Sequence, residues 1–301
     1  MDILFPYSYV SVNILSLLGC LVVLNTVGFI ISIVLLVLIY SGVIRITPIL
    51  KFFSWLVSTT MPARSAKIHT NIKESFKSRF TVPIPEGKYI YAWHPHGVIS
   101  MSQFFHIGTS FTDWPSHLRP ISGAIFSALQ WLPFGHELME YSTAIPGDYP
   151  TMKDALVEGK SISISVGGMR EMLGDSYIVT KRRGIFKMAL ETGTPIVPVL
   201  SFGENTLFTL VEIYKPIQDW LVRYDSCLCF PTFNSFRMWI NLLYEPLTKP
   251  ITSVVGTPIP VEQILEPTED DIAALRATYI EALKDLFMKE NPNKDEVFSI
   301  V

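Results

Sequence analysis

The N-terminal part of the chain is an almost unbroken run of apolar positions. No Asp, Glu, Lys or Arg occurs from Ile3 to Ile44. A single helix of that length would be about twice as long as a hydrocarbon core of roughly 30 Å. The polar stretch Asn25–Gly28 supplies turn chemistry near its middle. We therefore predict a transmembrane helical hairpin within residues 1–50, with one pass and an interfacial second half as the alternative.

The residues that follow combine aromatic side chains with positive charge. Phe52, Phe53 and Trp55 stand among scattered lysines and arginines. This mixture predicts an interfacial segment over residues 51–80 that lies in the headgroup layer of a membrane. Because basic residues flank the cytosolic ends of membrane segments, we expect the rest of the chain to face the cytosol.

From about residue 81 the pattern changes to short apolar runs separated by helical stretches. Strand-like runs lie at residues 89–93, 162–166, 195–200 and 252–255, and helical patterns lie at 151–158, 184–192 and 272–287. The last helix is preceded by a capping residue, Thr268, with acids in the first turn. Strands that alternate with helices indicate an α/β domain with a largely parallel sheet flanked by helices. We expect one catalytic domain over residues 81–301.

Composition and charge exclude several classes of protein. Hydrophobic residues make up 49% of the chain, charged residues 17%, and the mean hydropathy is +0.34. Such a domain is expected to lie against a bilayer. A net charge of −3 excludes a nucleic-acid binder, which needs a large basic excess. Cys20, Cys227 and Cys229 make neither a disulfide framework nor a four-ligand zinc set, so we expect no metal.

The first candidate for chemistry is the run His94-Pro95-His96-Gly97, which directly follows a strand-like segment. Proline restricts its own backbone and that of the residue before it, so the histidines are held in fixed directions. An imidazole can take a proton from an alcohol at neutral pH, and Gly97 allows close approach. A structural histidine pair in a turn is the alternative, and a His-x-His zinc site lacks an evident third ligand.

Two further motifs follow predicted strands. Gly167 and Gly168 leave backbone N–H groups open toward a ligand, and Glu171 is placed to orient an imidazole. Glu204 and Asn205 follow another strand, and polar groups at strand ends are where α/β folds bind ligands. A glycine turn with a solvated Arg-Glu pair is the alternative for the first of these motifs.

A basic cluster precedes the helical pattern at residues 184–192. Lys181, Arg182 and Arg183 stand directly before Gly184. Cations beside a helix N-terminus suit phosphate groups, although a plain basic loop would look the same.

Several familiar motifs are absent from the sequence. There is no Gly-x-Ser-x-Gly elbow, which argues against a serine lipase. The run Gly159-Lys160-Ser161 lacks the earlier glycine of a P-loop, and no dinucleotide fingerprint occurs. The remaining chemistry is a histidine base, an anion site for a phosphorylated donor and an apolar acceptor.

In this order the motifs resemble the type-2 diacylglycerol acyltransferase family, which includes monoacylglycerol and wax-alcohol acyltransferases. The run at residues 94–97 resembles the family's His-Pro-His-Gly signature, and Gly167-Gly168 with Glu171 resembles its Gly-Gly-x-x-Glu block. The likeness covers roughly residues 84–291. The sequence departs from the family at Ile185, where phenylalanine is usual, and it lacks the His-x4-Asp motif of the wider glycerolipid acyltransferase fold.

The resemblance implies a membrane-anchored, glycerolipid-acyltransferase-like domain that esterifies diacylglycerol with acyl-CoA, giving triacylglycerol without a cofactor. It implies His96 as the general base, His94 as a residue that shapes or polarises the site, and Glu171 as the carboxylate that holds the imidazolium. The positioning of substrate and oxyanion would fall to Gly97, Gly167, Gly168, Glu204 and Asn205. The binding of acyl-CoA would fall to Lys181, Arg182, Arg183 and Gly184.

The acceptor stays open among diacylglycerol, monoacylglycerol and fatty alcohol. A lysophosphatidate acyltransferase is disfavoured because the His-x4-Asp motif is missing. A non-catalytic lipid-binding membrane protein is the alternative from a different class, and acyl-CoA turnover would distinguish it. The family further implies the endoplasmic reticulum membrane with access to lipid droplets, and the oligomeric state, including a homo-oligomer, stays open.

Overall fold

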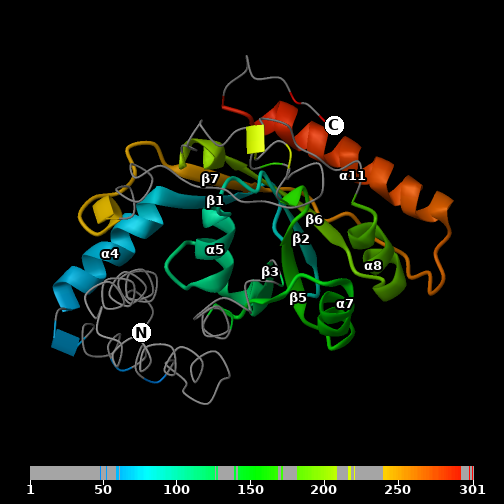
Figure 1. The fold of residues 1–301 in the computed structure, drawn as a ribbon, viewed down its shortest axis with the longest axis horizontal. Coiled ribbons are helices and arrows are strands. Elements are labelled where there is room, and N and C mark those ends of the chain that lie inside the picture. The colour runs from blue at the N-terminus through cyan, green and yellow to red at the C-terminus, as the bar shows by residue number, and fades with distance from the viewer. Residues whose placement is uncertain are drawn as a thin grey trace.

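The described part of the chain folds around a seven-stranded sheet (Figure 1). The computed structural model describes residues 62–125, 142–168, 171, 182–208 and 240–292, with a few single positions outside these ranges. The strands are β1 (Phe76–Phe80), β2 (Ile90–His94), β3 (Ile121–Ile125), β4 (Ile145–Pro146), β5 (Ser161–Ser165), β6 (Ile196–Phe202) and β7 (Ile251–Val255). The helices are α4 (Pro62–Ser75), α5 (Met101–Gly108), α7 (Tyr149–Val157), α8 (Gly184–Thr192) and α11 (Glu269–Glu290), with short 3-10 helices η1 (Ser116–Leu118) and η4 (Glu204–Thr206).

The sheet is mostly parallel, as the alternation of strands and helices predicts. Its order is β1-β7-β6-β2-β5-β3-β4. The strands from β6 to β4 run parallel, β7 is antiparallel to β6, and β1 is parallel to β7. Strand β2 therefore lies in the interior of the sheet, with β5 and β6 as parallel neighbours whose carboxyl ends lie at the same edge.

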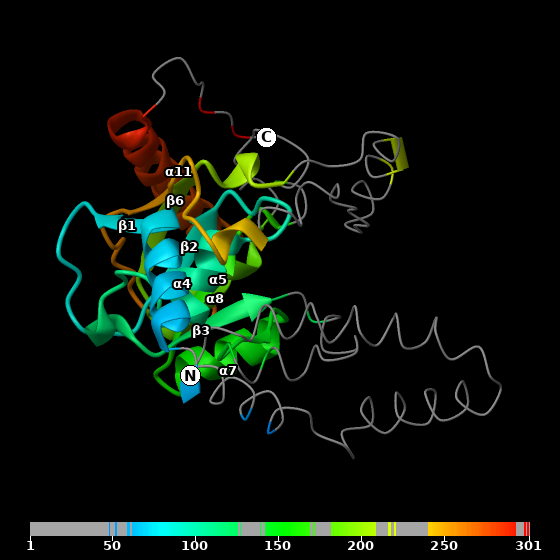
Figure 2. The same cartoon turned by 90° about the vertical axis from the view of Figure 1, so that its left-hand side faces the viewer.

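Helices cover both faces of the sheet. Figures 1 and 2 show α7, α8 and α11 over one face and α4 and α5 over the other. Side chains of β2 alternate between these faces, as strand geometry requires. Ile90 and Ala92 join the core cluster made with α7, α8 and α11, whereas Tyr91 and Trp93 pack in a different cluster with Ile107 of α5. Consecutive residues at the end of β2 are thus directed into different environments.

A buried polar network fixes α5 to the sheet beneath it. The indole Nε1 of Trp93 donates to Ser201 Oγ at 2.6 Å and to Ser102 Oγ at 3.1 Å. Ser102 also bonds Ser201 at 2.9 Å, and Ser201 bonds Ser253 at 2.8 Å. Buried hydroxyl groups need such partners. The network ties β2, β6 and β7 to the helix that follows the histidine motif.

Two helix ends confirm the boundaries expected from the sequence. Thr268 and Asp271 form a capping box at the start of α11, with both reciprocal hydrogen bonds present. At the end of α8, Gly193 adopts the left-handed conformation with φ of 58°.

The α/β fold begins before the expected boundary at residue 81. Strand β1 pairs with β7, and Ile68, Ile72 and Phe76 are buried. Residues 62–80, which we expected to form part of an interfacial segment, therefore contribute to the domain. The predicted hairpin at residues 1–50 lies almost entirely outside the described residues. None of the helices within the described ranges has the length and apolar character needed to cross a membrane.

Replacing Thr268 by alanine should destabilise the domain through the start of α11. The hydroxyl accepts the backbone N–H of Asp271, and losing an N-cap costs about 1 kcal/mol. In a domain of this size the melting temperature should fall by about 2–4 °C in thermal unfolding. Thr278→Ala is the matched control, because the Thr278 hydroxyl bonds a carbonyl within the same helix. Equal destabilisation by the two substitutions would contradict the capping role.

Candidate active site

The ends of three neighbouring strands bring the predicted catalytic residues together. Strand β2 ends at His94, while Gly167 and Glu204 each lie two residues beyond the ends of β5 and β6. Glu171 joins them from the segment after β5. Ligand sites in parallel sheets lie at the carboxyl ends of the strands, so this is the expected edge.

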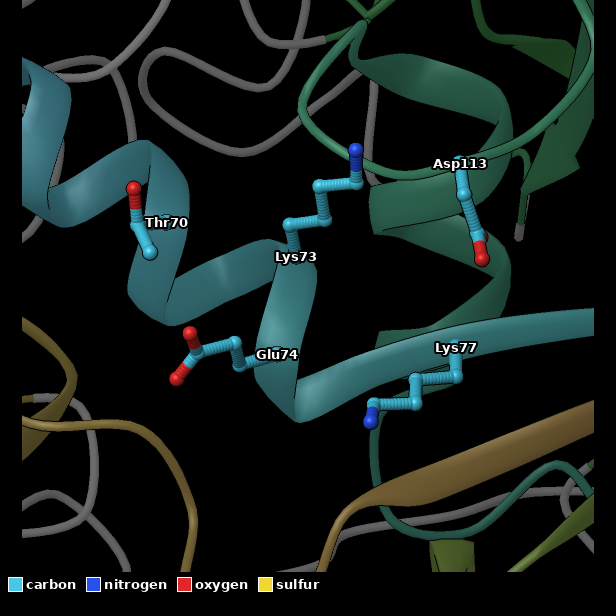
Figure 3. A pocket seen from close by; sticks show the side chains of 5 residues that line it. All are labelled: Thr70, Lys73, Glu74, Lys77 and Asp113. Carbon is cyan, nitrogen blue, oxygen red and sulfur yellow. The ribbon is translucent and has the colours of Figure 1, made fainter.

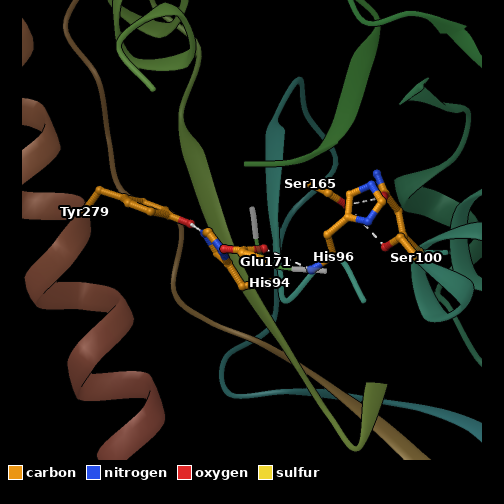
Figure 4. Close-up of polar contacts among 7 residues, drawn as sticks. His94, His96, Ser100, Ser165, Glu171 and Tyr279 are labelled. Carbon is orange, nitrogen blue, oxygen red and sulfur yellow. Dashed lines mark hydrogen bonds and ion pairs between the residues drawn. The ribbon is translucent and has the colours of Figure 1, made fainter. Parts of the chain in front are cut away.

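His94 lies at the centre of a buried hydrogen-bonded chain (Figure 4). Its Nδ1 is 2.5 Å from Oε1 of Glu171, and its Nε2 is 2.9 Å from the hydroxyl of Tyr279 on α11. The side chains of His94 and Glu171 are fully buried, and Tyr279 is buried with them.

The proton positions in this chain follow from the chemistry of its members. A carboxylate only accepts, so Nδ1 of His94 carries a proton, and Nε2 accepts the phenolic proton of Tyr279. Burial, and next the charge of Glu171, raise the pKa of Tyr279 well above its ordinary value, so the phenol keeps its proton. Both ring nitrogens of His94 are thereby occupied, which fits a positioning residue better than a base.

His96 has a different environment. Its backbone N–H donates to Oε2 of Glu171 at 2.9 Å, and its ring Nδ1 is 2.8 Å from the carbonyl oxygen of Gly97. Because a carbonyl only accepts, Nδ1 carries the proton and Nε2 is the basic nitrogen. Nε2 has no hydrogen-bond partner among the described residues, and the side chain is half-buried. In Figure 4 the two imidazoles lie on opposite sides of Glu171.

Gly167 allows the Glu171 carboxylate to reach both histidines. A Cβ atom at Gly167 would lie only 1.9 Å from Cδ and 2.1 Å from Oε1 of Glu171. No other residue type fits there without displacing the carboxylate. The next residue, Gly168, has a φ of +55°, which side chains rarely adopt.

Glu204 supports the loop that carries His96. Its carboxylate accepts the backbone N–H groups of Met101 at 2.6 Å and Ser102 at 3.3 Å, so it closes the N-terminus of α5. A Cβ atom at Gly97 would lie 3.1 Å from its Cγ, so the loop packs directly on this side chain. Burial raises the pKa of Glu204 to about 7, against hydrogen bonds from α5 that lower it.

The two described arginines of the basic cluster, Arg182 and Arg183, contact different residues. The side chain of Arg182 lies against Gly168, where a Cβ atom would be 3.1 Å from its Nη2. Arg183 forms an ion pair with Glu269 at the start of α11. Both arginines are exposed, Gly184 is the first residue of α8, and Lys181 lies outside the described residues. Arg182 is thus the described cation nearest to the glycine motif.

The geometry differs in two respects from the roles that the sequence suggested. Glu171 was expected to hold the imidazolium of His96, but it contacts the ring of His94 and the main chain of His96. The contact of Tyr279 with His94 was not anticipated, because Tyr279 occupies an apolar position of an amphipathic helix. Its signal is a polar hydroxyl on a buried face, which requires a partner. Asn205 is exposed in η4, and its role in positioning stays a prediction.

A hollow lies between α4, the start of β1 and the loop before Trp114, and none of the residues named above lines it (Figure 3). Its volume is about 390 Å³, and it is lined by Thr70, Lys73, Glu74, Lys77 and Asp113. In Figure 3 the two lysines extend in opposite directions, so their ammonium groups do not converge on one ligand. Within the described ranges no group of His, Cys, Asp and Glu is arranged to hold a metal ion.

Comparison with known proteins shows which family the chain is similar to. The family model described as diacylglycerol acyltransferase matches residues 73–297, which is most of the chain. The human protein "Diacylglycerol O-acyltransferase 2-like protein 6" is 30% identical over 265 residues, covering 78% of each chain.

Other relatives carry the names of other acceptors. The mouse "2-acylglycerol O-acyltransferase 1" is 32% identical over 222 residues, covering 67% of this chain and 65% of its own. The human "Acyl-CoA wax alcohol acyltransferase 2" is 29% identical over 222 residues, covering 67% and 66%. The names therefore agree on acyl transfer and differ in the alcohol that receives it.

Replacing Gly167 by alanine should abolish most activity. The new methyl group would push Glu171 away and break its bonds to both histidines. A misplacement of about 1 Å in such a site costs on the order of 10²-fold in rate. Acyl transfer by the purified variant is the measurement. Gly123→Ala is the control, because its methyl group would meet one side-chain atom at 4.0 Å. Near-normal turnover by Gly167→Ala would contradict the bridging role of Glu171.

The raised pKa of Glu204 predicts a pH-dependent stability. The folded-state pKa of about 7 exceeds the ordinary value of 4.5, so the folded protein binds this proton more tightly than the unfolded chain. The resulting stabilisation is full below the unfolded pKa and is lost as the pH rises through about 7. Glu204→Gln removes the titration but keeps an accepting oxygen. Chemical unfolding in detergent from about pH 5 to 8 should show a steeper fall for the wild type than for the variant. Parallel curves would refute the assignment.

Proposed function

The chain belongs to the diacylglycerol acyltransferase family, and on that premise we propose that it transfers the acyl group of acyl-CoA to the free hydroxyl of diacylglycerol, giving triacylglycerol. The observation that carries the proposal is the proton arrangement of His96. Its Nδ1 proton is engaged by Gly97, so Nε2 is the nitrogen that can accept a proton.

The reaction needs one proton transfer and one substitution at carbon. The hydroxyl oxygen of the acceptor attacks the thioester carbonyl while Nε2 of His96 takes the hydroxyl proton. A tetrahedral oxyanion forms, the C–S bond breaks, and CoA leaves as a thiolate that recovers the proton from His96. Because thiolate is a good leaving group, no covalent enzyme intermediate is needed.

The surroundings of His96 support this role electrostatically. The carboxylate of Glu171 accepts the backbone N–H of His96, so its negative charge lies close to the imidazolium that forms. Backbone N–H groups at Gly167 and Gly168 are proposed donors to the oxyanion, and each such donor is typically worth about 3 kcal/mol. Arg182, beside Gly168, is the proposed contact for the CoA phosphates, and Arg183 and Lys181 are proposed to add positive charge to the same site.

The proposed substrate also suggests where the enzyme acts. A neutral-lipid acceptor resides in a bilayer, so we propose that the enzyme acts at the endoplasmic reticulum membrane through the hairpin at residues 1–50. Its domain would face the cytosol, where acyl-CoA is found, and would require no cofactor.

The test uses membranes from a host that lacks its own triacylglycerol synthesis. Labelled acyl-CoA is supplied with diacylglycerol, monoacylglycerol, fatty alcohol or lysophosphatidate in separate assays. Labelled triacylglycerol from the wild type should fall by at least about 10²-fold in His96→Ala, because general base catalysis contributes 10²–10⁴-fold.

A matched control separates chemistry from folding. His117→Ala removes an exposed imidazole that bonds the carbonyl of Ile84, and it should retain turnover. Undiminished activity in a folded His96→Ala protein would eliminate His96 as the base. If product forms with a different acceptor, that acceptor replaces diacylglycerol in the proposal. If no product forms with any acceptor, the lipid-binding alternative is favoured.

A further inference from the structure

The buried face of α11 carries one hydroxyl group, that of Tyr279, in an otherwise apolar set. The other buried residues of this helix are Ile272, Leu283, Leu286 and Phe287. The side chain of Tyr279 has no exposed surface, and its ring packs against Phe186 of α8, with the ring centroids 5.5 Å apart. A buried hydroxyl group needs a partner inside the protein, and the proposed mechanism gives this one no task.

The hydroxyl group of Tyr279 contacts the ring nitrogen of His94 opposite the one that Glu171 binds. Its oxygen is 2.9 Å from Nε2 of His94, while Nδ1 of the same ring is 2.5 Å from Oε1 of Glu171. Figure 4 shows the three side chains in a row that starts at α11. The other oxygen of Glu171 accepts the backbone N–H of His96, so a residue of α11 is joined through hydrogen bonds to the main chain of the proposed base.

The phenol of Tyr279 is the donor in its contact with His94. Nδ1 carries the ring proton toward Glu171, so Nε2 has a lone pair to offer, and the phenolic proton has no other acceptor among the described residues. Burial, and next the charge of Glu171, raise the pKa of Tyr279 well above its ordinary value, so the proton stays on the phenol oxygen. A hydrogen bond donated to the neutral form of a group disfavours its charged form. Tyr279 therefore holds His94 as an uncharged imidazole.

The charge state of His94 decides how much of the negative charge of Glu171 acts on His96. If Nε2 took up a proton, His94 would be an imidazolium in direct contact with Glu171, and the two opposite charges would largely cancel. With His94 uncharged, the carboxylate keeps its full negative charge beside the main chain of His96. That charge favours the imidazolium that forms on His96 in the proposed reaction.

We propose that Tyr279 is a positioning residue of this enzyme, whose hydroxyl group keeps His94 oriented and uncharged so that the negative charge of Glu171 is left for His96. Full burial keeps Tyr279 out of reach of the substrate, so it acts through His94. The inference rests on the proposed function, because it gives Tyr279 a place in the support of the same histidine base.

The first experiment removes the hydroxyl group and keeps the ring, in Tyr279→Phe. Full-length wild type and variant are purified in detergent, and acyl transfer from labelled acyl-CoA to diacylglycerol is measured against the concentration of each substrate. We expect kcat per folded enzyme to fall by about tenfold, because a buried acceptor loses its donor, and both KM values to stay within about twofold. A purely structural role would lower the folded fraction and leave kcat per folded enzyme unchanged.

Tyr91→Phe is the matched control for the loss of a buried phenolic hydroxyl group. Tyr91 is as deeply buried as Tyr279 and lies on the strand that ends at His94. Its hydroxyl group has no hydrogen-bond partner among the described residues. The control should therefore keep the kcat of the wild type.

A double-mutant cycle tests whether Tyr279 acts through His94. His94→Asn keeps an amide donor in place of Nδ1, toward Glu171, and removes the Nε2 atom that Tyr279 contacts. If Tyr279 acts through this atom, adding Tyr279→Phe to His94→Asn should lower kcat by less than about twofold further. If His94→Asn has no measurable activity, the comparison of Tyr279→Phe with Tyr91→Phe decides alone.

Three results would overturn the proposal: equal kcat in Tyr279→Phe and Tyr91→Phe, a loss confined to KM, or an equal loss from Tyr279→Phe with His94 present and with His94→Asn. If the wild type prefers another acceptor, the same comparisons are made with that acceptor. Absence of turnover by the wild type with every acceptor would instead overturn the proposed function.

Discussion

The site depends on the carboxylate of Glu171, which binds the ring of one histidine and the backbone of the other. One oxygen takes the Nδ1 proton of His94 and the other takes the N–H of His96. A buried carboxylate is costly unless its oxygens are paired, and here both oxygens have histidine partners. The hydrogen bonds of Glu171 thereby hold the ring of His94 and the main chain of His96 in fixed positions relative to each other.

The sheet explains why two histidines so close in sequence have different surroundings. His94 is the last residue of β2, so it follows Ile90 and Ala92 onto the face covered by α11, where Tyr279 meets it. His96 lies beyond the strand, in the loop that leads to α5 and rests on Glu204. The first imidazole is enclosed and fully bonded, and the second keeps a basic nitrogen. Their positions relative to the end of β2 account for this difference in surroundings.

The parts that the sequence predicts are those governed by local rules. Alternating apolar runs locate most of the strands, Thr268 and Gly193 locate helix ends, and the His-Pro-His-Gly run locates the loop of the candidate site. Local rules do not predict which segments far apart in the sequence contact each other. The bond from Tyr279 to His94 depends on how α11 packs on the sheet, and β1 joins the fold through pairing with β7 near the other end of the chain. Glu171 was recognised as the partner of a histidine, but which ring it contacts depends on where each ring lies relative to the end of β2 and the packing around it.

The candidate site is divided between two faces of the sheet that differ in how deeply their residues are buried. The Tyr279–His94–Glu171 chain is buried, so a change there disturbs charged and polar groups that have no access to water. The side facing α5 is bordered by small hydroxyl residues, and Ser100 and Ser165 are half-buried. The buried chain is therefore the more constrained half of the site, because water cannot replace a partner that a substitution removes there.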